Sequence, residues 1–263
     1  MTHQFLERYI AGGSVVHQLD ARVKLVLTVM FIFCASLLPV ASWLALAALT
    51  ALVWAAIMAA DVGLTMILRR ALVALPFVLV VVTIIFSVPG RPVFRIPLGF
   101  ITLTATDAGL LRFLTIIWKS WISVQAALLL TATTHFIDVL RALRALRLPQ
   151  IMVAILSFMY RYLFILVDEA QRLLRARACR SAAPVGKGGG SVIWRATVTG
   201  RLVGTLFLRA YERSERVYVA MLSRGYAGEL RSLHAAAPAR RDVLVGIAGG
   251  FALLLIAAQA LAG

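Results

Sequence analysis

Two short arginine motifs are the residues of this chain whose types and spacing most suggest chemistry. They are Cys179-Arg180-Ser181 and Ser223-Arg224-Gly225, and each sets one arginine between small residues after a helix-like run. A guanidinium offers several donors in a rigid fork, and small neighbours let it approach another protein's backbone or carboxylates closely. The two arginines are 44 positions apart (224 − 180). One chain that presents the same small surface twice favours a docking platform for a two-subunit partner.

A second interpretation of these motifs needs no protein partner. Basic residues at helix ends are favoured by the helix dipole and by anionic lipid headgroups. The two interpretations predict different responses to a change from Arg to Lys. Attraction to lipid survives that change, whereas docking that depends on the guanidinium fork does not.

Groups for catalysis, nucleotide binding or metal binding are not evident elsewhere in the sequence. The histidines are scattered, at His3, His17, His135 and His234. No Ser/His/Asp or Cys/His arrangement accompanies them. The pair Gly186-Lys187 is followed by Gly188, not by the Ser or Thr of a phosphate-binding loop. We therefore expect a non-catalytic chain that binds no cofactor and no metal ion.

The stretch after the first motif predicts a flexible hinge. It contains Pro184 and then the glycines Gly186, Gly188, Gly189 and Gly190. Glycine-rich segments behave as flexible linkers because they lack side chains that restrict the backbone.

The composition indicates an integral membrane protein. Of the 263 residues, 62% are hydrophobic and 14% are charged, with a mean hydropathy of +0.92. A soluble domain has about 45–50% apolar and about 25% charged residues. The net charge of +16 is concentrated in one stretch, which favours a cytoplasmic membrane face over nucleic acid as the partner. We expect no disulfide between Cys34 and Cys179, and no cleaved signal peptide in the polar start of the chain.

Five apolar runs predict an all-α membrane protein. They cover residues 23–40, 43–60, 71–88, 110–131 and 243–261. We expect a polar turn at 61–70, a kink at Pro76 and a β-ribbon or extended loop after Pro92. The runs contain no Asp or Glu, which argues against a proton relay. Lys119 either snorkels or packs against a neighbouring carbonyl, or it lines a route for substrate.

The distribution of charge predicts the topology. Residues 132–242 carry 18 Lys/Arg against 7 Asp/Glu, whereas the loop 89–109 has two arginines against one aspartate. The positive-inside rule therefore puts 132–242 in the cytoplasm. The expected parts are a cytoplasmic N-terminal segment (1–22), four membrane helices (23–131) with an extracytoplasmic loop (89–109), a cytoplasmic coupling domain (132–242) and a last membrane helix (243–263). The C-terminus then lies outside.

The cytoplasmic stretch predicts one short and two long amphipathic helices. They cover 135–146, then Pro149 to about Ser181, then about Ser191 to Met221. The first half of the second helix is apolar apart from Arg161 and two tyrosines, so it lies along the membrane interface or crosses obliquely. Gly225 suits the left-handed position after the last helix.

In order and spacing, these segments resemble the transmembrane component of energy-coupling factor (ECF) transporters. The segment His17-Gln18-Leu19-Asp20-Ala21-Arg22-Val23-Lys24-Leu25 is similar to the family's HxLDPRxKL entry, with Ala21 in place of proline. Residues 143–149, 161–164 and 168–172 resemble the first long coupling helix and its approach. The two arginine motifs stand where the family has Ala-Arg-Ser/Gly and Ala-Arg-Gly. The residues of these segments look most like those of the CbiQ branch, which serves cobalt and sometimes nickel uptake.

The resemblance implies a scaffold and coupling subunit in the cell (inner) membrane. It implies two ATP-binding cassette ATPases as partners, which bind the ATP and Mg²⁺ and whose grooves receive Arg180 and Arg224. It also implies a substrate-capturing membrane subunit, CbiM-like in cobalt systems, and a glycine hinge that lets the coupling helices change their angle. Two alternatives stay open. One is the transmembrane component of a vitamin ECF transporter, and the other is a membrane-anchored, lipid-binding structural protein.

Overall fold

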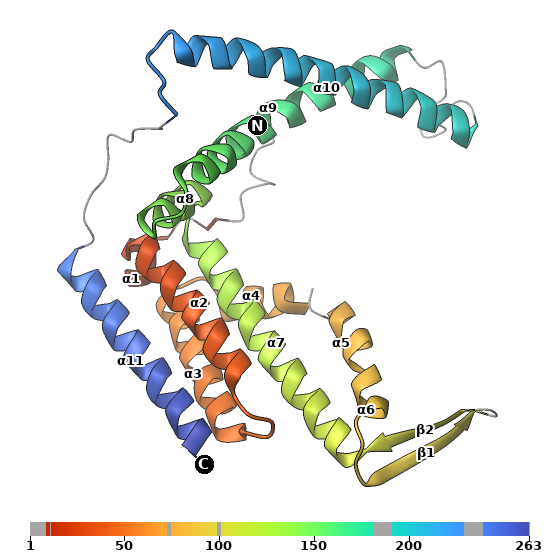
Figure 1. The fold of residues 1–263 in the computed structure, drawn as a ribbon, viewed down its shortest axis with the longest axis vertical. Helices are drawn as coiled ribbons and strands as arrows, with labels where there is room; N and C mark the ends of the chain where they lie inside the picture. The colour runs from red at the N-terminus through yellow and green to blue at the C-terminus, as the bar shows by residue number, and fades with distance from the viewer. Residues whose placement is uncertain are drawn as a thin grey trace. The chain divides into compact units, whose positions relative to one another are not determined.

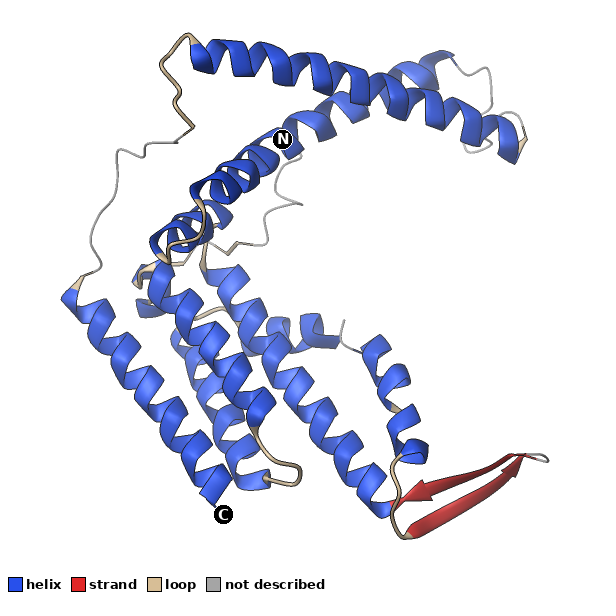
Figure 2. Cartoon of the chain, viewed as in Figure 1, coloured by secondary structure: helices blue, strands red, loops and turns tan. Residues whose placement is uncertain are grey.

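Helices predominate in the computed structural model, which describes residues 9–10, 12–72, 75–98, 101–180, 191–228 and 239–262 (Figures 1 and 2). The elements are α1 (Val15–Gln18), α2 (Ala21–Leu37), α3 (Trp43–Ala59), α4 (Leu64–Ala71), α5 (Leu75–Val81), α6 (Thr83–Ser87), β1 (Pro92–Leu98), β2 (Ile101–Thr106), α7 (Asp107–Thr133), α8 (Phe136–Ala145), α9 (Gln150–Arg180), α10 (Val192–Leu222) and α11 (Arg240–Ala262). The prediction of an all-α membrane protein is confirmed.

The chain divides into two compact units. The first, here called the membrane unit, contains residues 1–145 and 236–263, and the second, here called the helical-pair unit, contains residues 146–235. The described elements of the helical-pair unit are α9 and α10. The predicted division at residues 132 and 242 remains a prediction.

Helix α2 is the centre of the membrane unit and packs against α7, α8 and α11 (Figure 1). Two glycines let α11 approach it closely. A Cβ atom at Gly246 would lie 3.0 Å from Val23 Cγ1, and one at Gly249 would lie 3.1 Å from Leu27 Cδ2. Because these contacts advance together along both helices, α2 and α11 are parallel. Small residues at such contacts give membrane helices their van der Waals attraction.

Hydrogen bonds between side chains join α3 to α7. Trp118 Nε1 donates to Thr50 Oγ1 at 2.9 Å, and Trp54 Nε1 donates to Gln125 Oε1 at 3.1 Å. Gln125 is fully buried, so Trp54 supplies a hydrogen-bond partner that water cannot supply in the membrane core. From the first bond to the second, the residue numbers increase along both helices, so α3 and α7 are also parallel. The apolar core beside these bonds includes Leu46, Leu49, Ile57, Ile122 and Leu253.

Two local predictions are wrong. The polar turn expected at 61–70 contains α4, an amphipathic helix with Ile67 and Ala71 buried and Arg69 exposed. The prediction failed because a short amphipathic helix has a composition similar to that of a polar turn. The expected single helix at 71–88 is two short helices that meet at Val82. Thr83 Oγ1 donates to Val80 O at 2.8 Å and competes with the backbone there. Pro76 lies in the first turn of α5, where proline is tolerated.

The expected β-ribbon is confirmed as an antiparallel hairpin of β1 and β2, with Leu98 opposite Ile101. By length and composition, three of the described helices could cross a membrane, namely α7, α9 and the Arg240–Ala260 part of α11. Helix α3 and the stretch Val78–Ser87 are apolar but shorter. Since α9 is long and apolar enough to cross, its interfacial or oblique position stays a prediction.

The packing of α6 on α7 predicts a cost for a methyl group at Gly109. A Cβ atom there would lie 2.5 Å from Ile85 O and 2.8 Å from Thr106 Oγ1, and a backbone carbonyl cannot move aside cheaply. We expect Gly109→Ala to lower the free energy of unfolding by about 1–3 kcal/mol, measured by thermal or denaturant unfolding in detergent. The control is Gly204→Ala in α10, which meets open space and should raise stability by about 0.5–1 kcal/mol. Equal stability of Gly109→Ala and wild type would contradict this packing.

Candidate functional site

The helical-pair unit presents two long helices that run antiparallel. Arg177 Nη1 of α9 donates to Thr199 Oγ1 of α10 at 3.1 Å, and Arg209 of α10 pairs with Glu169 of α9. Contact positions fall along α9 as they rise along α10, which is possible only for antiparallel helices. Figure 1 shows the two helices crossing.

The two motif arginines lie at opposite ends of this pair. Arg180 is the last residue of α9, three residues beyond the contact between Arg177 and Thr199. Arg224 follows the end of α10, 25 residues beyond Thr199 (224 − 199), which corresponds to about 37 Å along a helix. The arginines are therefore too far apart for one narrow pocket to hold both.

The second motif ends α10 in a defined turn. Gly225 N–H donates to Leu222 O at 2.9 Å and Tyr226 N–H donates to Met221 O at 3.0 Å, the two bonds of a Schellman motif. Gly225 has a φ of +78°, in the left-handed region that glycine adopts without strain. This confirms the conformation predicted for Gly225. The turn presents Arg224 on a rigid helix end.

Both arginine side chains are exposed, and their neighbours Cys179 and Ser223 are exposed as well. Within the described residues, neither the guanidinium of Arg180 nor that of Arg224 has a hydrogen bond or an ion pair. By contrast, Glu169 holds Arg209, and Glu212 lies 3.9 Å from Arg216. Two guanidinium forks are thus exposed at the ends of these helices. Ser181 and the predicted hinge glycines Gly186, Gly188, Gly189 and Gly190 lie outside the described residues.

The N-terminal motif residues lie in the membrane unit, where His17 and Asp20 shape the chain locally. His17 Nδ1 bonds Ser14 Oγ at 2.7 Å and its Nε2 bonds Ile10 O at 3.0 Å, so both ring nitrogens are occupied. Asp20 Oδ1 caps α2 by accepting from Arg22 N–H at 2.8 Å. A carboxylate there also complements the positive end of the helix dipole. Leu19 follows α1 as its C-cap.

Lys24 ties the ends of two other helices to α2. Its Nζ donates to His17 O in α1 and to Thr133 O at the end of α7, each at 3.1 Å. Lys24 is only 8% exposed. The last carbonyls of a helix lack partners within it, and the ammonium supplies them with charge-assisted donors. The motif lysine is therefore a cross-link between three helices.

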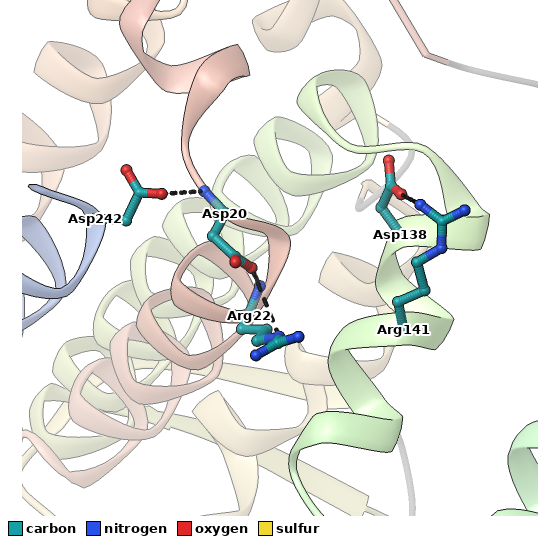
Figure 3. A network of polar contacts seen from close by, with 5 residues as sticks. All are labelled: Asp20, Arg22, Asp138, Arg141 and Asp242. Carbon is teal, nitrogen blue, oxygen red and sulfur yellow. Dashed lines mark hydrogen bonds and ion pairs between the residues drawn. The ribbon is translucent and has the colours of Figure 1, made fainter. Parts of the chain in front are cut away.

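Three carboxylates, those of Asp20, Asp138 and Asp242, come from different segments near the start of α2 (Figure 3). Asp242, in the first turn of α11, accepts from the backbone N–H of Asp20 at 3.3 Å. On α8, Asp138 pairs with Arg141 at 2.9 Å. The charges of Asp20, Asp138 and Asp242 all act on Lys24. This balance helps to keep a positive charge in a buried position.

Lys119 makes the corresponding link at the other end of α2. Its Nζ donates to Ser36 O and Leu38 O, at the end of α2. Packing against a neighbouring carbonyl is thus the alternative that holds. Sequence reasoning missed Gln125 and its partner Trp54, although an amide in an apolar run is itself a signal of an interhelical bond.

An apolar cavity of about 240 Å³ lies between α2, α3, α7 and α11. Lys24 is the one charged residue among those that line it. This lining suits an apolar group better than a metal cation, since cations need oxygen, nitrogen or sulfur ligands. Among the described residues, no cluster of three or more His, Cys, Asp or Glu could hold a metal ion.

Comparison with known proteins gives a consistent family. Residues 12–234 match the CbiQ family, described as cobalt transport protein. An uncharacterized protein of Methanocaldococcus jannaschii is 29% identical over 88% of this chain and 77% of its own length. The energy-coupling factor transporter transmembrane protein EcfT of Bacillus selenitireducens is 29% identical over 86% of this chain and 87% of its own. A putative fused cobalt transport protein CbiMQ of Methanocorpusculum labreanum is 32% identical over 38% of this chain and 16% of its own.

The turn after α10 predicts a graded response at Gly225. Alanine at a φ of +78° costs about 1–2 kcal/mol, whereas asparagine tolerates this conformation better. We expect Gly225→Ala to speed hydrogen exchange at the amides of Gly225 and Tyr226, with Gly225→Asn between it and wild type. Gly200→Ala, inside α10 and facing open space, should leave these two amides unchanged. Equal exchange in all four proteins would argue against the Schellman turn.

Proposed function

This chain belongs to the CbiQ family, the transmembrane components of ECF-type transporters, and from that premise we propose that it is the coupling subunit of an importer for cobalt or nickel ions. In this proposal it binds two ATP-binding cassette ATPases, which hold ATP and Mg²⁺. It transmits their movement to a substrate-capture membrane subunit. The chain itself performs no catalysis.

The observation that carries this proposal is the separation of two exposed guanidinium forks on one antiparallel helix pair. Arg180 and Arg224 end different helices, and Arg224 lies about 37 Å along α10 from Thr199, which contacts α9 near Arg180. Two copies of an ATPase need two docking points, one each. Small neighbours, such as Cys179, Ser223 and Gly225, let each fork enter a groove closely.

Helix directions in the membrane unit fit alternate crossings of the membrane, and the charge distribution selects the cytoplasmic side for the N-terminus. The contacts make α2 parallel to α11 and α3 parallel to α7, while Lys24 and Lys119 make α2 antiparallel to α7. If α2 leaves the cytoplasm, then α11 does too, and α7 returns to it. This alternation puts the β1–β2 hairpin outside and the start of α8 inside. It agrees with the charge distribution, which does not depend on these contacts.

The choice of substrate rests on the names of similar proteins. The family description and the fused CbiMQ relative both refer to cobalt, and the fusion supports a CbiM-like capture subunit as the partner. The EcfT relatives keep the vitamin branch as the alternative. Uptake assays with cobalt, nickel and vitamins by the complete complex distinguish the two.

Removing both forks should release the ATPases. We expect Arg180→Ala with Arg224→Ala to weaken ATPase binding about 30-fold or more per arginine, since truncating one partner of a buried, hydrogen-bonded charge pair costs about 2–5 kcal/mol. Co-purification of the ATPases and ATP-driven metal uptake are the measurements. The matched control is Arg175→Ala with Arg201→Ala, which removes two exposed arginines of the same helices outside the motifs.

Lysine at both positions separates docking from lipid attraction. Arg180→Lys with Arg224→Lys should also lose the ATPases, because an ammonium lacks the planar fork. If this double variant or the alanine variant keeps both ATPase binding and uptake, the docking role is wrong. Retained membrane surface binding alone would then favour the lipid-binding alternative.

The two cysteines test the orientation. Cys179 is exposed near the end of α9, whereas Cys34 is buried in α2 and only 7% exposed. We expect a membrane-impermeant maleimide to leave Cys179 unlabelled in intact cells and to label it in inside-out vesicles stripped of peripheral subunits. Cys34 should stay unlabelled in both until the protein is unfolded. Labelling of Cys179 in intact cells would place this end of α9 outside and overturn the proposed topology.

A further inference from the structure

The chain passes from the membrane unit to the helical-pair unit at a single described place, after α8, and the turn from α7 into α8 comes just before it; this turn is here called the junction. Thr133 ends α7, and Thr134 and His135 precede α8. If the junction bends freely, movement of α9 dissipates there and does not reach the membrane helices. The contacts that hold the end of α7 therefore decide how well any movement is transmitted.

Besides the packing of α8 against α2, three specific contacts hold this junction. Lys24 Nζ donates to Thr133 O, and the backbone N–H of Ile10 donates to Ala132 O at 3.0 Å. The ring of Tyr9 stacks on His135 with centroids 3.6 Å apart. Of these, only the Lys24 contact comes from a long membrane helix, and it also holds α1 through His17 O.

Lys24 is unfavourable for α2 considered by itself. It lies in the first turn, at the positive end of the helix dipole, and it is buried. Groups from other segments compensate, namely the carbonyls of His17 and Thr133 and the charges of Asp138 on α8 and Asp242 on α11, together with the charge of the N-cap Asp20. A residue that opposes its own helix and is stabilised by other segments has a tertiary role.

We propose that Lys24 is a positioning residue for coupling, which fixes the junction of α7 and α8 to α1 and α2 so that movement of the coupling helices reaches the membrane helices. This inference rests on the proposed function. In this role Lys24 bonds two backbone carbonyl groups, each at 3.1 Å. It acts through the carbonyl groups of His17 and Thr133.

The test uses the complete complex with its ATPases and capture subunit in proteoliposomes, and it measures metal ions taken up per ATP hydrolysed. We expect Lys24→Met to keep the ATPases bound and to lower this ratio about tenfold, since a hydrogen bond to a charged group typically contributes enough for such a change. The matched control is Lys119→Met. This substitution also removes an ammonium that donates to two carbonyls at a helix end. Lys119, however, lies 14 residues before Thr133 at the junction (133 − 119).

The ratio for Lys119→Met should stay within about twofold of wild type, because its bonds hold the far end of α2. An unchanged ratio in Lys24→Met overturns the inference, and so does an equal fall in both variants, which would reflect stability alone. A wild-type complex without ATP-driven uptake would instead refute the proposed function.

A second measurement needs no variant and so does not depend on folding of Lys24→Met. Hydrogen exchange at the Ile10 amide reports the contact with Ala132 O. If Lys24 keeps the junction fixed, protection of this amide is the same in the nucleotide-free and ATP-bound wild-type complex. Loss of protection on ATP binding would make the junction a hinge and contradict the proposal.

Discussion

The membrane unit depends on the need of helix ends for hydrogen-bond partners where water is scarce. Its solution is a pair of lysines on antiparallel helices. Lys24, near the start of α2, donates to the last carbonyl of α7, and Lys119 of α7 donates to the carbonyls at the end of α2. Each ammonium also complements the negative end of the helix that it contacts. The two bonds together set the register of α2 against α7.

The rest of the membrane unit follows from this pair. Helix α11 lies along α2 through Gly246 and Gly249, and Asp242 joins its first turn to Asp20. Helix α3 lies along α7 through its bonds to Trp118 and Gln125. Each neighbour uses small residues or paired polar groups, because apolar surface alone does not drive helix association in lipid.

The helical-pair unit is held together differently from the membrane unit. Many of its large apolar side chains are exposed, among them Val203, Phe207 and Leu208 of α10. Two polar bonds between α9 and α10, Glu169 with Arg209 and Arg177 with Thr199, lie near the surface, and exposed ion pairs contribute little, about 0–1 kcal/mol each. A weakly held pair with free arginines at its ends is suited to a partner that moves one helix relative to the other.

The sequence by itself determined the positions of the long helices to within a few residues, but not those of α4, α5 and α6. The last long helix was expected at 191–221 and runs Val192–Leu222, because amphipathic spacing, a serine cap and a terminal glycine are all local signals. The family was also evident, from short motifs in a fixed order. Only the tertiary structure decided which groups the motif residues serve. Lys24 and Thr133 are 109 positions apart, and no local pattern predicts that pairing. The antiparallel pairing of α9 with α10 and the break at Val82 likewise arise from long-range contacts and from one competing hydroxyl, which periodicity does not encode.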